Sequence, residues 1–186
     1  MTNSTISGNQ GNPFGGGGGL YNSGTATLLH VTIAFNASIT VLNQPPEGGG
    51  IVNSGTLTLR STLLSRNSQD CSGTINSQGN TLVCNATSCT MLAAINDQIG
   101  TTSRPISAQV LALAANGGPT LTHALRYLSP AIDNADPNAC PATDQRGVTR
   151  PQDGDGNGRL GCDIGAFERE PTQTLGQHGF FPLLDR

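Results

Sequence analysis

An internal repeat constrains the fold of this chain more than any other feature. The segment GGGLYNSGTATLLHVTIAFN at residues 17–36 aligns without a gap with GGGIVNSGTLTLRSTLLSRN at residues 48–67, an offset of 31 residues. A partial third copy, at residues 2–9, matches the back half of the unit. A repeat of this length indicates a stack of similar structural units.

The pattern inside each unit predicts strands joined by turns. Residues 56–59, Thr-Leu-Thr-Leu, alternate polar and apolar side chains with the period of two that a strand requires. Asn-Ser-Gly at residues 22–24 and 53–55 predicts turns, because Asn and Gly tolerate positive φ.

Each unit closes with an Asn, at Asn9, Asn36 and Asn67. If the units stack at about 4.8 Å, these side chains could form a hydrogen-bonded ladder. The alternative is that they serve only as turn formers. We therefore predict an all-β fold, a right-handed parallel β-helix (solenoid) of few coils over residues 1–90.

Composition favours such a stack over a conventional globular core. Aromatic residues make up 4% of the chain, Trp is absent and Gly occurs 25 times. The net charge of −3 gives no basic surface for nucleic acid. No window approaches the roughly 20 apolar residues that span a bilayer. Five Cys favour an extracellular, oxidising compartment, and no signal peptide is visible in this chain.

The pattern changes after residue 90. We expect residues 91–168 to form a C-terminal subdomain that caps the stack, because an uncovered coil end exposes apolar surface and unpaired backbone groups. Residues 111–115, Leu-Ala-Leu-Ala-Ala, predict a short helical turn. Residues 169–186 are expected to form a tail of low order, in which the apolar residues 180–184 could dock.

The cysteines allow more than one pairing. Cys140 and Cys162 bracket an Asp-rich loop and are expected to form a disulfide. Cys71 and Cys89 are expected to form a second one, which leaves Cys84 free, although a Cys84–Cys89 bond is the rival pairing. Metal binding by Cys is not expected, since no CxxC pair occurs.

The Asp-rich loop contains the first half of a Ca²⁺-binding pattern. The sequence DGDGNG at residues 153–158 has oxygen ligands at alternate positions and Gly at the sixth. The bidentate Glu of that pattern is missing, so Asp163 or Glu168 would have to replace it. The candidate ligands are Asp153, Asp155, Asn157, the Arg159 carbonyl and Asp163. The alternative is a solvated Asp-Gly loop.

Charged residues of the TDQRG segment suggest a structural lock. Asp144 and Arg146, with Arg150 and Asp163 nearby, are predicted to form a buried ion-pair network, because the Arg fork binds carboxylates bidentately. An anion or sugar site built on the same Arg residues is the alternative.

No constellation of catalytic residues is found. Glycan-cleaving enzymes need paired carboxylates, and only Glu47, Asp70 and Asp97 precede residue 129. The His residues are scattered along the chain. We expect His30 to occupy a surface position on a strand and His123 to act as a structural hydrogen-bond donor.

The C-terminal half resembles a known family. The motifs are NGGPTLTHAL (116–125), SPAID (129–133), CPATDQRGVTRP (140–151) and CDIGAFE (162–168). They resemble the choice-of-anchor Q domain, and the upstream units resemble the CSLREA-type and polymorphic outer-membrane-protein-like repeats that this domain follows in bacterial surface proteins. The resemblance implies secretion or surface display and implies no catalytic residues.

The sequence thus predicts a non-enzymatic extracellular or cell-surface module that adheres to a glycan or protein and forms the C-terminal part of a larger protein. One alternative is a structural subunit that stacks on other copies of itself through its open coil end. The other is a polysaccharide lyase or hydrolase of β-helix type. No cofactor other than Ca²⁺ is expected.

Overall fold

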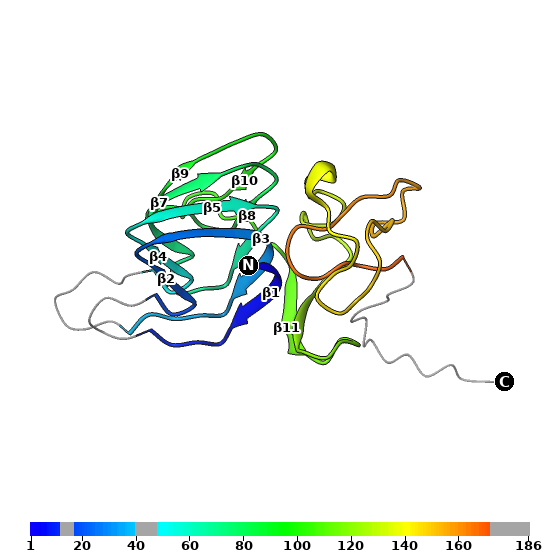
Figure 1. Cartoon of the computed structure of the whole chain (residues 1–186), viewed down its shortest axis with the longest axis horizontal. Coiled ribbons are helices and arrows are strands. Elements are labelled where there is room, and N and C mark those ends of the chain that lie inside the picture. The colour runs from blue at the N-terminus through cyan, green and yellow to red at the C-terminus, as the bar shows by residue number, and fades with distance from the viewer. Residues whose placement is uncertain (12–16, 40–47, 172–186) are drawn as a thin grey trace.

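The computed structural model describes residues 1–11, 17–39 and 48–171, and its fold is all-β, as predicted (Figure 1). A ten-stranded parallel sheet contains most of the strands, and a separate antiparallel pair follows it. One 3₁₀ helix, Pro137–Ala139, is present in the described residues. The strands are β1 (Thr2–Ser7), β2 (Leu20–Asn22), β3 (Thr25–Ala34), β4 (Ile51–Asn53), β5 (Thr56–Arg60), β6 (Leu63–Ser65), β7 (Cys71–Ser77), β8 (Leu82–Val83), β9 (Cys89–Leu92), β10 (Gln98–Ile99), β11 (Val110–Ala114) and β12 (Thr122–Leu125).

The large sheet consists of successive turns of chain, which we call layers. The first layer holds β1, the second β2 and β3, the third β4 to β6, the fourth β7 and β8, and the fifth β9 and β10. Every strand pairing in this sheet joins consecutive layers. Leu28 pairs with Leu59 in direct parallel register. The prediction that residues 31 apart lie over one another is therefore confirmed for the second and third layers.

The later layers use less chain. Ile51 pairs with Cys71, and Gly73 pairs with Cys89, so the offset shortens to 20 and then to 16 residues. The parallel pairing continues to Ile99, which lies beyond the boundary that we expected at residue 90. Layers of different length can stack because only the paired segments must match, while the connecting loops vary.

The interior of the layers is aliphatic. In β5 the side chains alternate, and Leu57 and Leu59 are fully buried while the Thr between them is half-buried. Burying an aliphatic side chain of this size contributes roughly 1.5–3 kcal/mol. The residues of this core are Leu28, Val31, Ile33, Ile51, Leu57, Leu59, Leu64, Cys71, Ile75, Val83 and Ala86.

The three repeat Asn residues form the ladder that the sequence allowed. Asn9 Nδ2 donates to Asn36 Oδ1 at 2.9 Å, and Asn36 Nδ2 donates to Asn67 Oδ1 at 3.0 Å. Asn67 Nδ2 then donates to Asp70 Oδ1 at 2.9 Å. A Cβ on Gly50 would lie 2.9 Å from Asn67 Nδ2, so the glycines of the repeat leave room for these amides.

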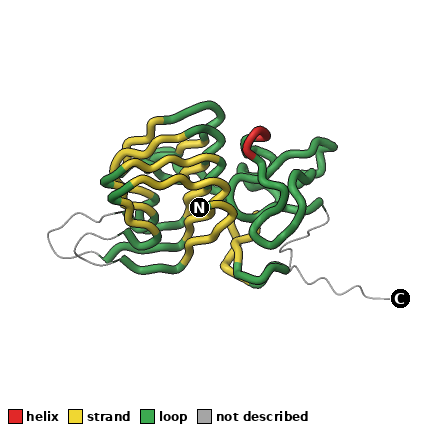
Figure 2. Tube along the Cα trace, viewed as in Figure 1, coloured by secondary structure: helices red, strands yellow, loops and turns green. Residues whose placement is uncertain are grey.

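We expected the C-terminal segment to cap the end of the stack. It lies along the side of the stack instead (Figures 1 and 2). It forms hydrogen bonds with every layer, through Thr5, Thr32, Ser61, Asn80 and Gln98 in turn. A second core fills the space between the two parts. It includes Leu63 and Leu82 from the layers together with Val110, Leu125, Ile132, Ile164 and Phe167 from the segment.

This lateral position has a physical reason in the layers themselves. The side of the layers carries apolar side chains, which the segment buries, and hydrogen-bonding groups, to which the segment supplies partners. Arg60 forms a salt bridge with Asp136, and Ser61 Oγ accepts a hydrogen bond from the backbone N–H of Asp136.

Two smaller expectations about the C-terminal region were wrong. Residues 111–115 are not a helical turn, since Val110–Ala114 forms strand β11 and pairs antiparallel with β12. Arg169 was assigned to the tail, but it is buried and its backbone N–H donates to Asp163 Oδ2 at 2.6 Å. Residues 172–186, including the segment 180–184 that we expected to dock, lie outside the described residues.

Two disulfides connect neighbouring segments. One joins Cys71 with Cys89 and so links the fourth layer to the fifth. The other joins Cys140 with Cys162 across the Asp-rich loop. Cys84 is free and buried, so the rival Cys84–Cys89 pairing does not occur.

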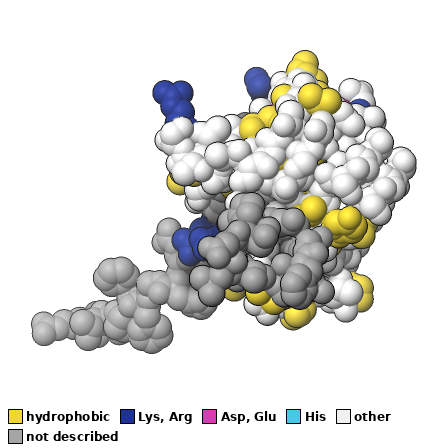
Figure 3. All heavy atoms as spheres, turned by 90° about the vertical axis from the view of Figure 1, so that its left-hand side faces the viewer, with side chains coloured by type: hydrophobic (Ala, Val, Ile, Leu, Met, Phe, Trp, Pro, Cys, Tyr) yellow, Lys and Arg dark blue, Asp and Glu magenta, His cyan; other side chains and the backbone are white. Residues whose placement is uncertain are grey.

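The outer face of the layers carries few charges. In Figure 3, which views the stack from the side opposite the C-terminal segment, uncharged polar side chains and backbone cover most of the described surface. Among the described residues no helix has the length and apolar character to cross a membrane.

We predict that Asn36→Ala lowers the free energy of unfolding by about 2–3 kcal/mol, because it leaves buried partners of the ladder without a hydrogen bond. Asn9→Ala, at the exposed end of the ladder, serves as the matched control and should cost less than about 1 kcal/mol. Urea unfolding with the disulfides intact measures both values. Equal losses for the two variants would contradict a ladder that depends on its buried centre.

Candidate functional site

The predicted ion pair between Asp144 and Arg146 forms, but the carboxylate that pairs with Arg150 is that of Glu168, which was not predicted. Arg146 Nε donates to Asp144 Oδ2 at 2.8 Å, and the Arg146 guanidinium carbon lies 3.7 Å from the centre of the Phe167 ring. Arg150 Nη1 lies 3.5 Å from Glu168 Oε2, and both side chains are fully buried. These two Arg side chains are inaccessible, so they lock the segment and offer no open anion site.

His30 was expected at the surface, and this expectation was wrong. It is fully buried, and its Nδ1 lies 2.5 Å from Arg150 Nη1. Because a guanidinium can only donate, Nδ1 accepts from Arg150, and the proton of the neutral ring sits on Nε2, which has no hydrogen-bond partner among the described residues. Burial and the charge of Arg150 lower the pKa of His30 to about 3. His30 therefore remains neutral and joins the second layer to the C-terminal segment.

Asp163 and Glu168 form a buried carboxyl pair. The Asp163 carboxylate accepts hydrogen bonds from the backbone N–H groups of Asp133 and Arg169. Glu168 accepts from the backbone N–H groups of Gln152 and Asp163. Burial raises the pKa of Asp163 well above its ordinary value and raises that of Glu168 to about 7, although Arg150 opposes the second shift.

The carboxylates that the structure brings together differ in part from the predicted Ca²⁺ ligands. Asp153 and Asp155 lie together, and the third carboxylate is Asp133; ligand atoms of these residues lie within 4.8 Å of one another. Asp163 is instead fully buried in the carboxyl pair and does not belong to this group of ligand atoms. Asn157 Oδ1 accepts the backbone N–H of Arg159, so this part of the loop is closed by its own hydrogen bonds.

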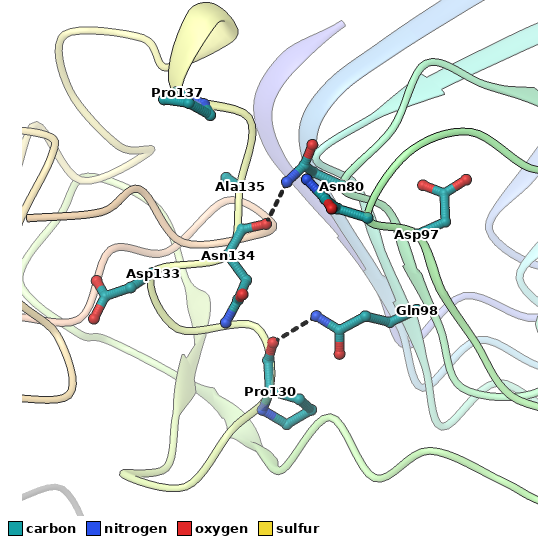
Figure 4. A pocket seen from close by; sticks show the side chains of 9 residues that line it. Asn80, Asp97, Gln98, Pro130, Asp133, Asn134, Ala135 and Pro137 are labelled. Carbon is teal, nitrogen blue, oxygen red and sulfur yellow. Dashed lines mark hydrogen bonds between the residues drawn. The ribbon is translucent and has the colours of Figure 1, made fainter.

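Asp133 connects this acidic group to an open cleft between the layers and the C-terminal segment (Figure 4). The cleft has a volume of about 680 Å³ and is predominantly polar. Its lining residues are Asn80, Asn96, Asp97, Gln98, Pro130, Asp133, Asn134, Ala135 and Pro137.

Two hydrogen bonds hold the walls of the cleft at a fixed separation. Asn80 Nδ2 donates to the carbonyl of Asn134 at 2.9 Å, and Gln98 Nε2 donates to the carbonyl of Pro130 at 2.8 Å (Figure 4). The side-chain oxygens of Asn80 and Gln98 accept no hydrogen bond from the described residues, so they remain available to a ligand. Because the walls are already fixed, less conformational entropy of the protein is lost when a ligand binds.

Three cleft residues have left-handed backbone conformations. Asn80, Asn96 and Asp133 have φ values of 53°, 58° and 55°. Such conformations occur mainly at Asn, Asp and Gly, and they gather at functional sites when the surrounding structure holds them in place. Burial raises the pKa of Asp133, and the charges of Asp155 and Asp153 add to this shift.

Sequence reasoning did not identify this cleft. Asn80 and Gln98 come from the fourth and fifth layers, whereas Asn134 comes from the C-terminal segment, so no local motif contains them. The only sequence signal is that Asn and Asp gather in the turns that meet there.

Comparison of the chain with protein-family models, with curated proteins and with solved structures gives no match.

We predict that stability falls as the pH rises through 7. Glu168 has an ordinary pKa of 4.5 and a pKa of about 7 in the fold, so the folded chain retains a proton that the unfolded chain releases. The stabilisation is complete below pH 4.5, falls as the pH rises to 7 and is absent above pH 7. It amounts to roughly 3–4 kcal/mol at about 1.4 kcal/mol per pKa unit.

Urea unfolding between pH 5 and pH 8 measures this slope. Glu168→Gln should reduce this slope to the part that the raised pKa of Asp163 contributes. Glu170→Gln, which changes a partly exposed carboxylate two residues away, should leave the slope intact. Stability that stays constant across this pH range would show that the pair is already ionised in the folded state.

Proposed function

We propose that this chain is a non-enzymatic extracellular module, a right-handed parallel β-helix with a lateral C-terminal segment, which binds a glycan in the cleft between the two parts. The two disulfides are consistent with an oxidising compartment. The resemblance to the choice-of-anchor Q domain supports placement in a larger bacterial surface protein.

The polar, open character of the cleft is the observation that carries this proposal. A glycan presents closely spaced hydroxyl groups that both donate and accept hydrogen bonds. The amides of Asn80, Gln98 and Asn134 can do the same. An apolar small molecule would find few partners here, because most of the lining is polar.

Binding without cleavage is favoured by the state of the carboxylates. Asp97 Oδ1 accepts from Ser77 Oγ and from the Thr81 N–H, and Asp97 Oδ2 accepts from the Ala94 N–H. This carboxylate therefore fixes the turns of the fourth and fifth layers. Hydrolysis of a glycosidic bond would need two carboxyl groups free to act on the substrate, and Asp133 is the only other acidic residue in the lining.

We also propose that Ca²⁺ binds to Asp133, Asp153 and Asp155. Carboxylate oxygens are the ligands that this cation prefers, and a bound cation would offset the repulsion among the three charges. Because Asp133 also lines the cleft, occupation of this site would fix one wall of the glycan site.

The test is binding of the disulfide-bonded chain to a panel of neutral oligosaccharides, with Ca²⁺ and with a chelator. We expect saturable binding to at least one of them, stronger with Ca²⁺. Asn134→Trp should weaken it at least tenfold by filling the cleft, while Ser88→Trp, a matched change at an exposed position outside the lining, should not.

Three results would overturn parts of this account. Absence of binding to any neutral oligosaccharide would contradict the glycan site. Release of shorter products would contradict a non-enzymatic role. Equal binding with Ca²⁺ and with the chelator would contradict the cation's contribution.

A further inference from the structure

A second groove, with a lining distinct from that of the cleft, lies between the layers and strand β11. It has a volume of about 540 Å³, and its lining includes Phe35 and Arg66 from the layers and Gln109 and Arg126 from the C-terminal segment. A neighbouring hollow shares Arg66, Ser107 and Gln109 with it, so the groove continues past these residues. No acidic residue lines either part.

The repeat places Arg66 over an aromatic ring. Phe35 and Arg66 directly precede the ladder residues of the second and third layers, and both have a φ of 57°. The Arg66 guanidinium carbon lies 5.4 Å from the centre of the Phe35 ring. A guanidinium over an aromatic face is attracted to it, so this exposed side chain is partly ordered before a ligand arrives.

His123 holds the aromatic ring in place. Its ring is stacked on Phe35 with the centroids 5.0 Å apart. His123 Nδ1 lies 2.7 Å from the carbonyl of Leu111, and Nε2 lies 2.7 Å from Ser7 Oγ. His123 therefore has the structural hydrogen-bonding role that we predicted. By holding the Phe35 ring, it also helps to position Arg66.

Arg66 and Arg126 differ from the arginines that stabilise the fold. Arg60, Arg146 and Arg150 each form a salt bridge with a carboxylate. Arg66 and Arg126 are exposed, and neither has a carboxylate within ion-pair distance among the described residues. Two unneutralised guanidinium groups in one groove, in a chain with a net charge of −3, indicate a site for an anionic ligand.

We propose that this groove binds an acidic oligosaccharide through the carboxylates of its uronic acid residues. A guanidinium binds a carboxylate through two parallel hydrogen bonds. The Ser107 hydroxyl makes no hydrogen bond within the described residues. Gln109 Nε2 donates to the Leu128 carbonyl, which leaves Gln109 Oε1 as an acceptor for sugar hydroxyls.

Other anionic polymers fit this groove less well. A nucleic acid requires a longer basic track and free aromatic faces for its bases, whereas the groove has two Arg residues and its only aromatic ring, Phe35, is already stacked on His123. An acidic peptide offers few hydroxyl groups to the Ser107 hydroxyl and the Gln109 amide that also line the groove.

The experiment measures binding of the disulfide-bonded chain to a linear trimer of galacturonic acid by titration calorimetry at low and high salt. We expect saturable binding that weakens at least tenfold in Arg66→Gln and in Arg126→Gln, and that falls with added salt. Arg159→Gln removes the same charge from an exposed position outside the groove and should leave the affinity unchanged. The unfolding midpoint of each variant verifies that it is folded.

Several outcomes would overturn this proposal. They are no saturable binding of the trimer, equal loss in Arg159→Gln, or equal affinity for a neutral galactose trimer, a sulfated galactose trimer or a hexapeptide of Glu. The proposal does not rest on the glycan cleft, and Asn134→Trp separates the two sites. This variant should retain binding of the acidic trimer, and loss of that binding would contradict an independent groove.

Discussion

The structure depends on the close contact between backbones of consecutive layers. A Cβ on Gly19 would lie 2.7 Å from the carbonyl oxygen of Gly50, so the chain can pass at this point only as glycine. The same contact aligns Asn36 and Asn67, whose amides join the layers from the side. The glycines and the Asn ladder both depend on the register of the layers. The glycines allow the backbones to approach, and the Asn amides can form a continuous chain only where the backbones are in register.

This requirement explains why the sequence revealed some layers and not others. The second and third layers share GGG, NSGT and the closing Asn, and these features predicted their register correctly. The fourth and fifth layers contain neither the GGG nor the closing Asn. Cys71 and Gly73 still pair in parallel register, but with shorter offsets that no alignment of the repeat can find.

The arrangement of the C-terminal segment was less accessible to sequence reasoning. Its residue types indicated a buried ionic lock, and Arg146 does bind Asp144. Several partners that position the segment, however, lie on the layers, more than 100 residues away in the sequence. His30 illustrates the difficulty, because its local pattern on a strand predicts an exposed side chain, and only the approach of Arg150 makes it buried.

The lateral segment also creates both proposed binding surfaces. One lies where Asn134 meets the fourth and fifth layers, and the other where β11 passes beside Phe35 and Arg66. A segment covering only the end of the stack would form neither. The candidate sites therefore follow from tertiary packing, which explains why motifs and spacing did not identify them.

Cross-linking of Thr25→Cys with Thr56→Cys tests the register most directly. These two exposed residues are paired in neighbouring strands, where adjacent chains lie about 4.8 Å apart, within the span of a disulfide. Under mild oxidation the double variant should form a third disulfide, detected by mass spectrometry, much faster than Thr25→Cys with Thr58→Cys. Equal rates for the two variants, or a faster reaction at Thr58, would contradict the stacking of residues 31 apart.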